Sequence, residues 1–269
     1  MEPTKGFVDS KDGTRIAYTR YGSGPAVVLI DGALAAQEFG PNKSLAEALS
    51  SRYTVYTYDR RGRGESGDNL PVDIEREFED LDAVIDLAGG PVMLYAISSG
   101  GGLVLDYLRS GRTVRKVALY EVPFVVDDNT RPPAPADYVE HLTSLLAQGK
   151  NGDAVKYFMR AGVHLPALMV AAFPLFPGWS HLKTVAPTMA YDIQYVQAFQ
   201  RGRKLPADRW AGLDLPVTVI AGSKSPAWMR NANAALAQAI PGASHRVLPG
   251  QTHLVKAPVL APALIEFFG

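Results

Sequence analysis

The chain has 269 residues, of which 47% are hydrophobic and 20% are charged, and it contains no cysteine. This is enough apolar material for one large core, and the absence of cysteine excludes disulfides and cysteine-ligated metal sites. Lysine plus arginine and aspartate plus glutamate both number 27, so the formal net charge is zero. This balance predicts neither a nucleic-acid partner nor a membrane partner. No apolar run is long enough to cross a bilayer and residues 1–6 lack the apolar core of a signal peptide, so we expect a cytoplasmic protein.

The pattern of apolar and charged residues predicts strands and helices that follow one another along most of the chain. Strands are predicted over residues 14–18, 26–30, 53–58, 91–95, 114–120, 215–221 and 245–248. Helices are predicted over residues 44–49, 72–87, 103–108 and 231–239, with a final helix that ends at Phe267 and Phe268. Strands that alternate with helices indicate a parallel sheet with helices on both faces, which is the α/β class.

Residues 122–208 depart from this alternation. The segment opens with the proline-rich run 131–135 and continues as helical segments without strand signals. We therefore expect residues 1–121 and 209–269 to form an α/β core and residues 122–208 to form an inserted helical cap over one end of the sheet. Most apolar side chains of this cap are expected to pack in a core, and a minority to line a pocket.

Ser98 lies in the most informative stretch, where an apolar strand runs into very small residues and then into a helix. A serine held at a sharp strand-to-helix turn tolerates only small neighbours two positions before it and two and three positions after it. These positions hold Ala96, Gly100 and Gly101. Centring the pattern on Ser99 would place an isoleucine where a small residue is required, so Ser98 is the predicted nucleophile. The alternatives are a glycine-rich phosphate-binding turn and a plain loop.

His253 is the candidate general base. A serine hydroxyl is a poor nucleophile near neutral pH, and it needs a base within hydrogen-bond reach. His253 lies in the loop between the last strand and the last helix, from which a side chain can reach back over the sheet edge to Ser98. The other histidines are His141, His164 and His181 in the cap, and His245 at the start of a strand.

Three separated motifs show a resemblance to a known family. They are the Asp31-Gly32-Ala33 turn after an apolar strand, the run Asp59-Arg60-Arg61-Gly62-Arg63-Gly64-Glu65-Ser66, and the turn around Ser98. The second motif resembles the Asp-x-Arg-Gly-x-Gly-x-Ser loop of the α/β-hydrolase fold superfamily at every fixed position. By this resemblance the chain is identified as a serine-nucleophile hydrolase of that superfamily with a helical cap, over nearly its whole length outside the variable cap.

The resemblance implies a catalytic acid, and this chain departs from the usual place for it. Relatives commonly carry the acid after the strand that follows the cap, in a Gly-x-x-Asp pattern, where this chain has Ser225. Other relatives take the acid from the end of the strand before the cap, where this chain has Glu121. A carboxylate there can accept a hydrogen bond from the histidine ring, so Glu121 is the predicted acid, with Asp127 and Asp128 as alternatives.

Asp31 is the second departure, because relatives often carry His-Gly at this point. The backbone N–H groups of Ala33 and Ser99 are expected to form the oxyanion hole, since backbone donors do not depend on side-chain identity. A carboxylate beside that hole would oppose negative charge unless it is turned away, protonated or paired, and Arg61 is the candidate partner. Alternatively, Asp31 only makes hydrogen bonds with the backbone of the turn.

The predicted activity is hydrolysis of an ester, thioester or lactone of a small apolar or aromatic compound. Ser98 would attack the carbonyl, His253 would move the proton, and Glu121 would orient the imidazolium. The triad requires no metal and no organic cofactor, and a small-molecule substrate is the only predicted partner. The alternatives are a cofactor-free perhydrolase or carbon–carbon hydrolase with the same triad, and a non-hydrolytic ligand-binding or tailoring protein of the same fold.

Overall fold

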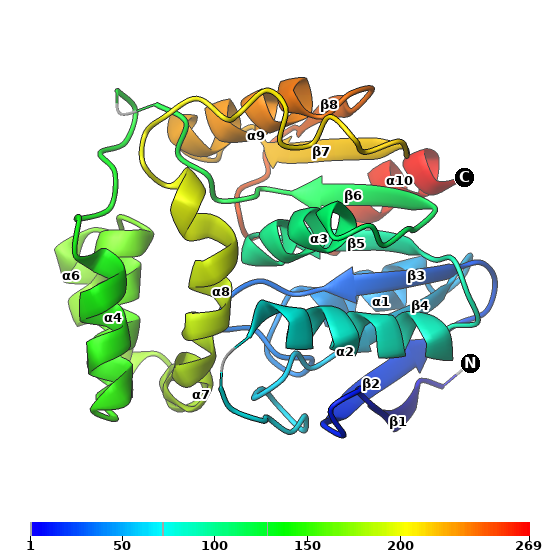
Figure 1. The fold of residues 1–269 in the computed structure, drawn as a ribbon, viewed down its shortest axis with the longest axis horizontal. Helices are drawn as coiled ribbons and strands as arrows, with labels where there is room; N and C mark the ends of the chain where they lie inside the picture. Colours follow the sequence, from blue (N-terminus) through cyan, green and yellow to red (C-terminus); the bar gives the residue numbers. More distant parts are fainter. Residues whose placement is uncertain (1, 72, 128) are drawn as a thin grey trace.

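A sheet of eight strands organises the computed structural model, which describes residues 2–71, 73–127 and 129–269 (Figure 1). The strands are β1 (Thr4–Asp9), β2 (Arg15–Tyr21), β3 (Ala26–Ile30), β4 (Thr54–Tyr58), β5 (Met93–Ile97), β6 (Lys116–Tyr120), β7 (Val217–Gly222) and β8 (Ser244–Leu248). Their order across the sheet is β1-β2-β4-β3-β5-β6-β7-β8. β2 pairs antiparallel with β1 and with β4, and the other neighbouring pairs are parallel. The predicted mostly parallel α/β sheet is therefore confirmed.

The sequence pattern does not predict β1, the first strand at the sheet edge. Its six residues include two large apolar side chains and an internal glycine, and both features weaken a strand signal. β1 pairs with β2 from Thr4 opposite Arg20 to Asp9 opposite Arg15, and none of its residues is fully buried. We infer that β1 forms because β2 offers backbone hydrogen bonds, more than because its own side chains are buried.

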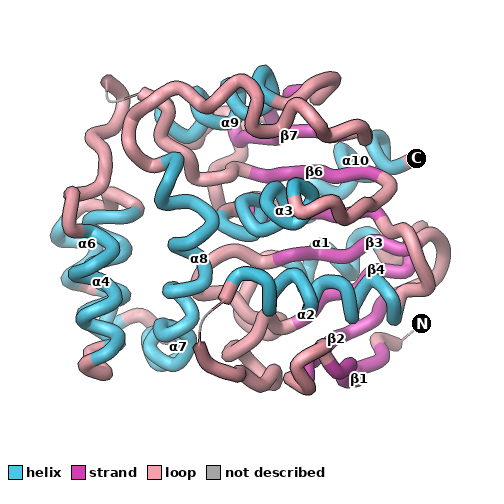
Figure 2. The backbone as a smooth tube through the Cα atoms, in the orientation of Figure 1, coloured by secondary structure: helices cyan, strands magenta, loops and turns pink. Residues whose placement is uncertain are grey.

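Helices cover both faces of the sheet (Figures 1 and 2). On one face lie α1 (Asn42–Leu49) and α10 (Ala257–Phe268), and on the other lie α2 (Ile74–Leu87), α3 (Ser99–Arg109) and α9 (Ala227–Ala239). Side chains alternate between the two faces, so Leu94 of β5 packs with α2 and α3 whereas Tyr95 packs with α1 and α10. Among the residues that the structure describes, no helix combines the length and hydropathy that crossing a bilayer requires.

α2 shows how local signals set a helix boundary. It begins at Ile74 because Asp73 caps it, with Oδ1 accepting a 3.0 Å hydrogen bond from the Glu75 N–H. The predicted start at Val72 lies outside the described residues. Phe78 and Leu81 of the predicted apolar stripe are buried in the core, so the 3.6-residue period correctly predicted the inward face.

The chain between β6 and β7 is helical. It contains α4 (Tyr138–Ala147), α5 (Asn151–Tyr157), the π-helix η1 (Phe158–Gly162), α6 (Ala167–Ala171), the 3₁₀ turn η2 (Phe173–Leu175), α7 (Trp179–Val185), the 3₁₀ turn η3 (Ala186–Thr188), α8 (Met189–Val196) and the 3₁₀ turn η4 (Gln197–Phe199). We call α4 to α8 the cap helices. They share an apolar core that includes Leu142, Val155 and Met189. Figure 1 shows them beyond the ends of the strands toward which the arrows point, with α8 nearest the sheet.

α8 packs directly on α3. A Cβ added at Gly102 of α3 would lie 2.9 Å from the Cβ of Tyr195 on α8, so a larger residue would push the two helices apart. The Tyr195 ring also lies near the Phe78 ring of α2, with 6.4 Å between ring centroids. These contacts place the last cap helix over the first turns of the helix that begins after Ser98.

Candidate active site

Ser98 occupies a strained turn between β5 and α3. Its backbone has φ +58° and ψ −133°. A non-glycine residue holds such a conformation only when its surroundings impose it, and this kind of strain recurs at functional sites. The Ser98 N–H donates a 2.9 Å hydrogen bond to the Tyr120 carbonyl, which ties the turn to the end of β6. The geometry has the features that a nucleophile elbow requires.

The glycines around this turn allow the segment after β3 to approach Ser98. A Cβ added at Gly100 would lie 2.7 Å from the carbonyl oxygen of Asp31. A Cβ added at Gly32 would lie 2.7 Å from the Cβ of Ser98. Both positions therefore need glycine, and the backbone of residues 31–33 lies directly beside the predicted nucleophile.

Glu121 directly follows β6 and contacts His253, which lies in the loop after β8. The Nδ1 atom of His253 lies 2.9 Å from Oε2 of Glu121, which is fully buried. The other carboxylate oxygen, Oε1, accepts a 2.7 Å hydrogen bond from the Gly222 N–H and another from the Ser225 hydroxyl. Glu121 also has a left-handed backbone, with φ +49°. The carboxylate thus has donors on both oxygens, and the contact with Nδ1 turns Nε2 of His253 into the ring atom available for proton transfer.

Asp127, one of the two alternative acids, is not placed in this way. Oδ1 of Asp127 accepts hydrogen bonds from the N–H of Thr130 at 3.0 Å and from its hydroxyl at 2.6 Å, and Oδ2 accepts one from Asn231 at 3.3 Å. Asp128 lies outside the described residues. In the part of the chain that the structure describes, no group of three or more His, Asp or Glu side chains is arranged to hold a metal ion.

The structure gives fewer contacts for the predicted nucleophile, base and oxyanion donors than for Glu121, the predicted acid. Within residues 2–71, 73–127 and 129–269, no hydrogen bond joins the Ser98 hydroxyl to His253. Such bonds are often long before a substrate binds. Ser99 is the first residue of α3, where backbone N–H groups have no partner within the helix and the helix dipole favours negative charge. Ala33 precedes Leu34, which is held at φ +62° in the neighbouring turn.

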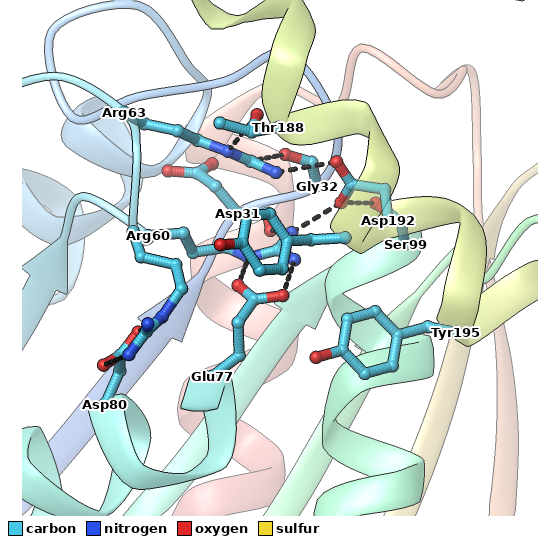
Figure 3. Close-up of polar contacts among 12 residues, drawn as sticks. Asp31, Gly32, Arg60, Arg63, Glu77, Asp80, Ser99, Thr188, Asp192 and Tyr195 are labelled. Atoms are coloured by element: carbon cyan, nitrogen blue, oxygen red, sulfur yellow. Dashed lines mark hydrogen bonds and ion pairs between the residues drawn. The ribbon is translucent and has the colours of Figure 1, made fainter. Parts of the chain in front are cut away.

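A buried carboxylate from the cap helices lies beside the start of α3 (Figure 3). Asp192 of α8 accepts hydrogen bonds from Nη1 of Arg60 at 2.6 Å, from Nη2 of Arg63 at 2.7 Å and from the hydroxyl of Ser99 at 2.8 Å. Arg60 also donates to both oxygens of Glu77, at 2.6 and 2.7 Å. Burial alone would raise the pKa of Asp192, but the two guanidinium groups hold it below its ordinary value. The positive charges of Arg60 and Arg63 therefore balance the negative charges of Asp192 and Glu77 in the interior.

The same two arginines hold the backbone beside Ser98. Arg63 donates to the Gly32 carbonyl at 2.6 Å and, through Nε, to the Thr188 hydroxyl at 3.0 Å. Arg60 donates to the Asp31 carbonyl at 3.3 Å. The arginine-rich motif of residues 59–66 thus positions the segment that carries the predicted oxyanion donor at residue 33.

Asp192, Glu77 and Ser225 are the site residues that sequence reasoning missed. Arginines in a buried motif loop require buried carboxylates nearby, which is a signal that such residues exist. The sequence does not indicate which of its 27 acidic residues supply them. Ser225 did have a signal, since it occupies the position where relatives carry the acid. Its hydroxyl donates a hydrogen bond to Glu121, the acid predicted in its place.

The predicted pairing of Arg61 with Asp31 is wrong. Arg61 donates to both oxygens of Asp80 on α2, at 2.6 and 2.8 Å, and to Asp12 at 3.1 Å. Neighbouring arginines of the loop take different partners. Arg63 pairs with Asp192 of α8, and Arg60 lies between Asp192 and Glu77 of α2 (Figure 3).

Asp31 itself is almost completely buried, with 3% of its surface exposed. Within the described residues its Oδ1 atom has no hydrogen-bond partner. Burial raises the pKa of Asp31 to about 7, against the opposing charges of Arg63 and Arg60. The sequence predicted that a carboxyl group here would be turned away, protonated or paired, and the raised pKa favours the protonated form.

Comparison with known proteins agrees with this fold. The profile of the alpha/beta hydrolase family matches residues 31–265, and the chain therefore belongs to that family. A solved alpha/beta hydrolase from Sphaerobacter thermophilus DSM 20745 is 45% identical, with a TM-score of 0.90 over 98% of this chain and 100% of that chain. An enol-lactonase from Burkholderia xenovorans LB400 is 21% identical, with a TM-score of 0.68 over 98% and 99% of the two chains. An esterase from Thermogutta terrifontis is 19% identical, with a TM-score of 0.70 over 98% of each chain.

A match among curated proteins covers a smaller share of the matched protein. The probable oxidoreductase EphD of Mycobacterium tuberculosis is 28% identical over 257 residues, which cover 82% of this chain and 41% of that protein. The chain thus spans about two fifths of the length of the curated relatives that it matches.

Replacement of Asp192 by asparagine should strongly destabilise the protein. The change leaves the buried guanidinium groups of Arg60 and Arg63 short of one negative charge, and we expect a loss of about 3–5 kcal/mol in the free energy of unfolding. Urea unfolding measures this loss. Asp153→Asn is the control, because that exposed carboxylate of α5 has only a 4.0 Å surface contact with Lys156. A loss below about 1 kcal/mol in Asp192→Asn would show that the buried network is not needed.

Replacement of Asp31 by asparagine should change how stability depends on pH. The folded-state pKa of Asp31 is raised to about 7, so the native carboxyl keeps its proton while the unfolded chain loses it. Its contribution to stability is therefore full at low pH and is lost as pH rises toward 7. The advantage of Asp31→Asn over wild type should grow by roughly 2–3 kcal/mol between pH 5 and pH 8, as measured by urea unfolding. The exposed Asp9→Asn variant should show no such growth, and a constant difference for Asp31→Asn would contradict the raised pKa.

Proposed function

We propose that this alpha/beta hydrolase is a serine ester hydrolase that uses Ser98, His253 and Glu121 as its triad. The observation that carries the proposal is the 2.9 Å contact between His253 Nδ1 and the buried Glu121 carboxylate, formed at the end of the sheet that also carries the strained Ser98 turn. The substrate class is an ester, thioester or lactone of a small compound. The esterase and the enol-lactonase with the same fold support this class by analogy.

Acylation follows from the roles of these groups. Ser98 Oγ attacks the carbonyl carbon while Nε2 of His253 takes the hydroxyl proton. The negative charge that forms on the carbonyl oxygen is bound by the N–H groups of Ser99 and Ala33. The tetrahedral intermediate then collapses, and His253 gives its proton to the departing alcohol or thiol. Water repeats the attack on the acyl-enzyme, with His253 again as base, and releases the acid and free Ser98.

Glu121 supports these steps without direct contact with the substrate. Its buried carboxylate accepts the Nδ1–H of His253, which selects the tautomer with a basic Nε2 and stabilises the imidazolium. The N–H of Gly222 and the hydroxyl of Ser225 hold the second oxygen, so the carboxylate cannot rotate away. Ser225 is thus a positioning residue for the acid.

Ser98→Ala should abolish ester hydrolysis and labelling by a fluorophosphonate probe. Loss of the nucleophile is expected to lower kcat by several orders of magnitude. Ser99→Ala is the matched control, because its hydroxyl bonds Asp192 and its backbone N–H is kept. Hydrolysis of short-chain 4-nitrophenyl esters and mass spectrometry of the labelled protein provide the measurements. A larger loss of activity in Ser99→Ala than in Ser98→Ala would identify Ser99 as the nucleophile. Absence of labelling in the wild type would favour a non-hydrolytic protein.

Glu121→Gln should lower kcat by about 10²–10⁴-fold while the protein remains folded. Glutamine keeps the shape but removes the charge that stabilises the imidazolium. Asp127→Asn is the control, since Asp127 bonds Thr130 in the following loop. Steady-state kinetics and circular dichroism would separate the two variants, and an unimpaired Glu121→Gln enzyme would exclude this carboxylate as the acid.

A further inference from the structure

Arg131 differs from the other buried arginines near the site. It is 3% exposed, and its Nε and Nη1 atoms have no hydrogen-bond partner within the described residues. Arg60, Arg61 and Arg63 are equally buried, but each pairs with at least one buried carboxylate. Among the residues that the structure describes, no carboxylate forms an ion pair with Arg131.

The surroundings of Arg131 come from the cap helices and from α9. Its Nη2 donates to the Gly162 carbonyl, and its guanidinium carbon lies 4.4 Å from the centroid of the Trp228 ring. Gly162 ends the π-helix η1, a rare geometry that is frequent at functional sites. Two residues later, His164 has a left-handed backbone with φ +63°, and its Nε2 is buried without a partner in the described residues. Arg131 and His164 are therefore two polar side chains of this segment with buried atoms that lack a partner within the described residues.

The electrostatics of this place favour an anion. Burial lowers the pKa of Arg131 to about 10, so the group remains a cation at neutral pH. Burial and then the charge of Arg131 lower the pKa of His164, which keeps that imidazole neutral and able to share a proton with a ligand oxygen. A buried cation without a counter-ion costs stability, and that cost is removed when an anion binds. The planar guanidinium fits the geometry of a carboxylate.

Arg131 is connected to the triad by two short stretches of chain. Trp228, under the guanidinium, is three residues from Ser225, whose hydroxyl donates to Glu121. Val125 packs on Trp228 and follows Glu121 by four residues. Figure 1 shows the chain leaving β6 toward the cap helices at the end of the sheet where the triad lies. We infer that Arg131 lies at the same end of the sheet as Ser98.

We propose that Arg131, with His164 beside it, binds a free carboxylate of the substrate. The proposal rests on the proposed serine hydrolase function and narrows its substrate class. The ester or lactone would carry a carboxylate remote from the scissile bond, as a monoester of a dicarboxylic acid does, with its apolar chain between the two ends. Hydrolysis adds one water, breaks the acyl–oxygen bond and releases the dicarboxylic acid and the alcohol.

The experiment compares two substrates that differ in whether the remote carboxyl group is free or esterified. They are monoethyl glutarate and diethyl glutarate, whose second carboxyl is capped. For the wild type we expect kcat/KM to be at least about tenfold higher for the monoester, because a charge-assisted hydrogen bond contributes that much. In Arg131→Met the ratio of the two kcat/KM values should fall to about one, and Arg131→Lys should keep part of the preference. Arg203→Met, which removes an exposed arginine from the same segment, should leave the ratio unchanged.

Binding of the product gives a readout that does not depend on catalysis. Glutarate should raise the Tm of wild type and of Ser98→Ala, and it should not raise the Tm of Arg131→Met. Arg131→Met without ligand should be at least as stable as wild type, since the change removes a buried charge that has no ion-pair partner among the described residues. Asp128→Asn should preserve both the kinetic preference and the glutarate effect.

Each outcome separates the two proposals. Equal rates on the two esters, or a preference that survives in Arg131→Met, would overturn the carboxylate site and leave the serine hydrolase intact. A marked loss of stability in Arg131→Met would assign the arginine a structural role and also overturn the site. Absence of hydrolysis with both esters, together with a glutarate effect on Tm that requires Arg131, would reject the hydrolase and retain the carboxylate site.

Discussion

The buried carboxylate of Asp192, shared between Arg60 and Arg63, is the interaction on which the rest of the site depends. It joins α8 of the cap helices to the loop of residues 59–66, and through the Ser99 hydroxyl it reaches the first turn of α3. The two arginines in turn hold the carbonyl groups of residues 31 and 32. With Glu77 of α2, which pairs with Arg60, the cap, the motif loop and the turn after Ser98 form one charge-neutral unit. Removal of any charged member leaves an opposite charge buried without its partner.

The position of Glu121, the proposed acid, follows from a second constraint, which is that a buried carboxylate needs hydrogen-bond donors. Glu121 follows β6 with a left-handed backbone, and its side chain points toward the end of β7. There it accepts hydrogen bonds from the Gly222 N–H and the Ser225 hydroxyl. A serine at the position usual for the acid is thus compatible with a carboxylate on the neighbouring strand. Both arrangements bring a carboxylate to the same histidine, because adjacent parallel strands end at one edge of the sheet.

Within residues 2–71, 73–127 and 129–269, two buried ionisable groups, Asp31 and Arg131, form no ion pair. Asp31 lies beside the proposed oxyanion donors, and burial keeps it protonated up to about pH 7. Arg131 lies on the side of Trp228 and remains a cation. In the proposed substrate, the reacting carbonyl would become negative near the protonated Asp31, and the remote carboxylate would be bound by Arg131.

The sequence by itself determined the order of strands and helices, the turn around Ser98, and the candidates His253 and Glu121. These depend on local periodicity, on small residues at fixed spacing and on the rule that parallel strands end together, all of which act over short stretches of chain. Only the tertiary structure decided that Asp192 reaches Ser99, that Arg61 turns to α2, and that β1 adds to the sheet edge. Partners of buried charges are chosen by the packing of segments more than 100 residues apart in some cases, and no local pattern encodes which carboxylate arrives.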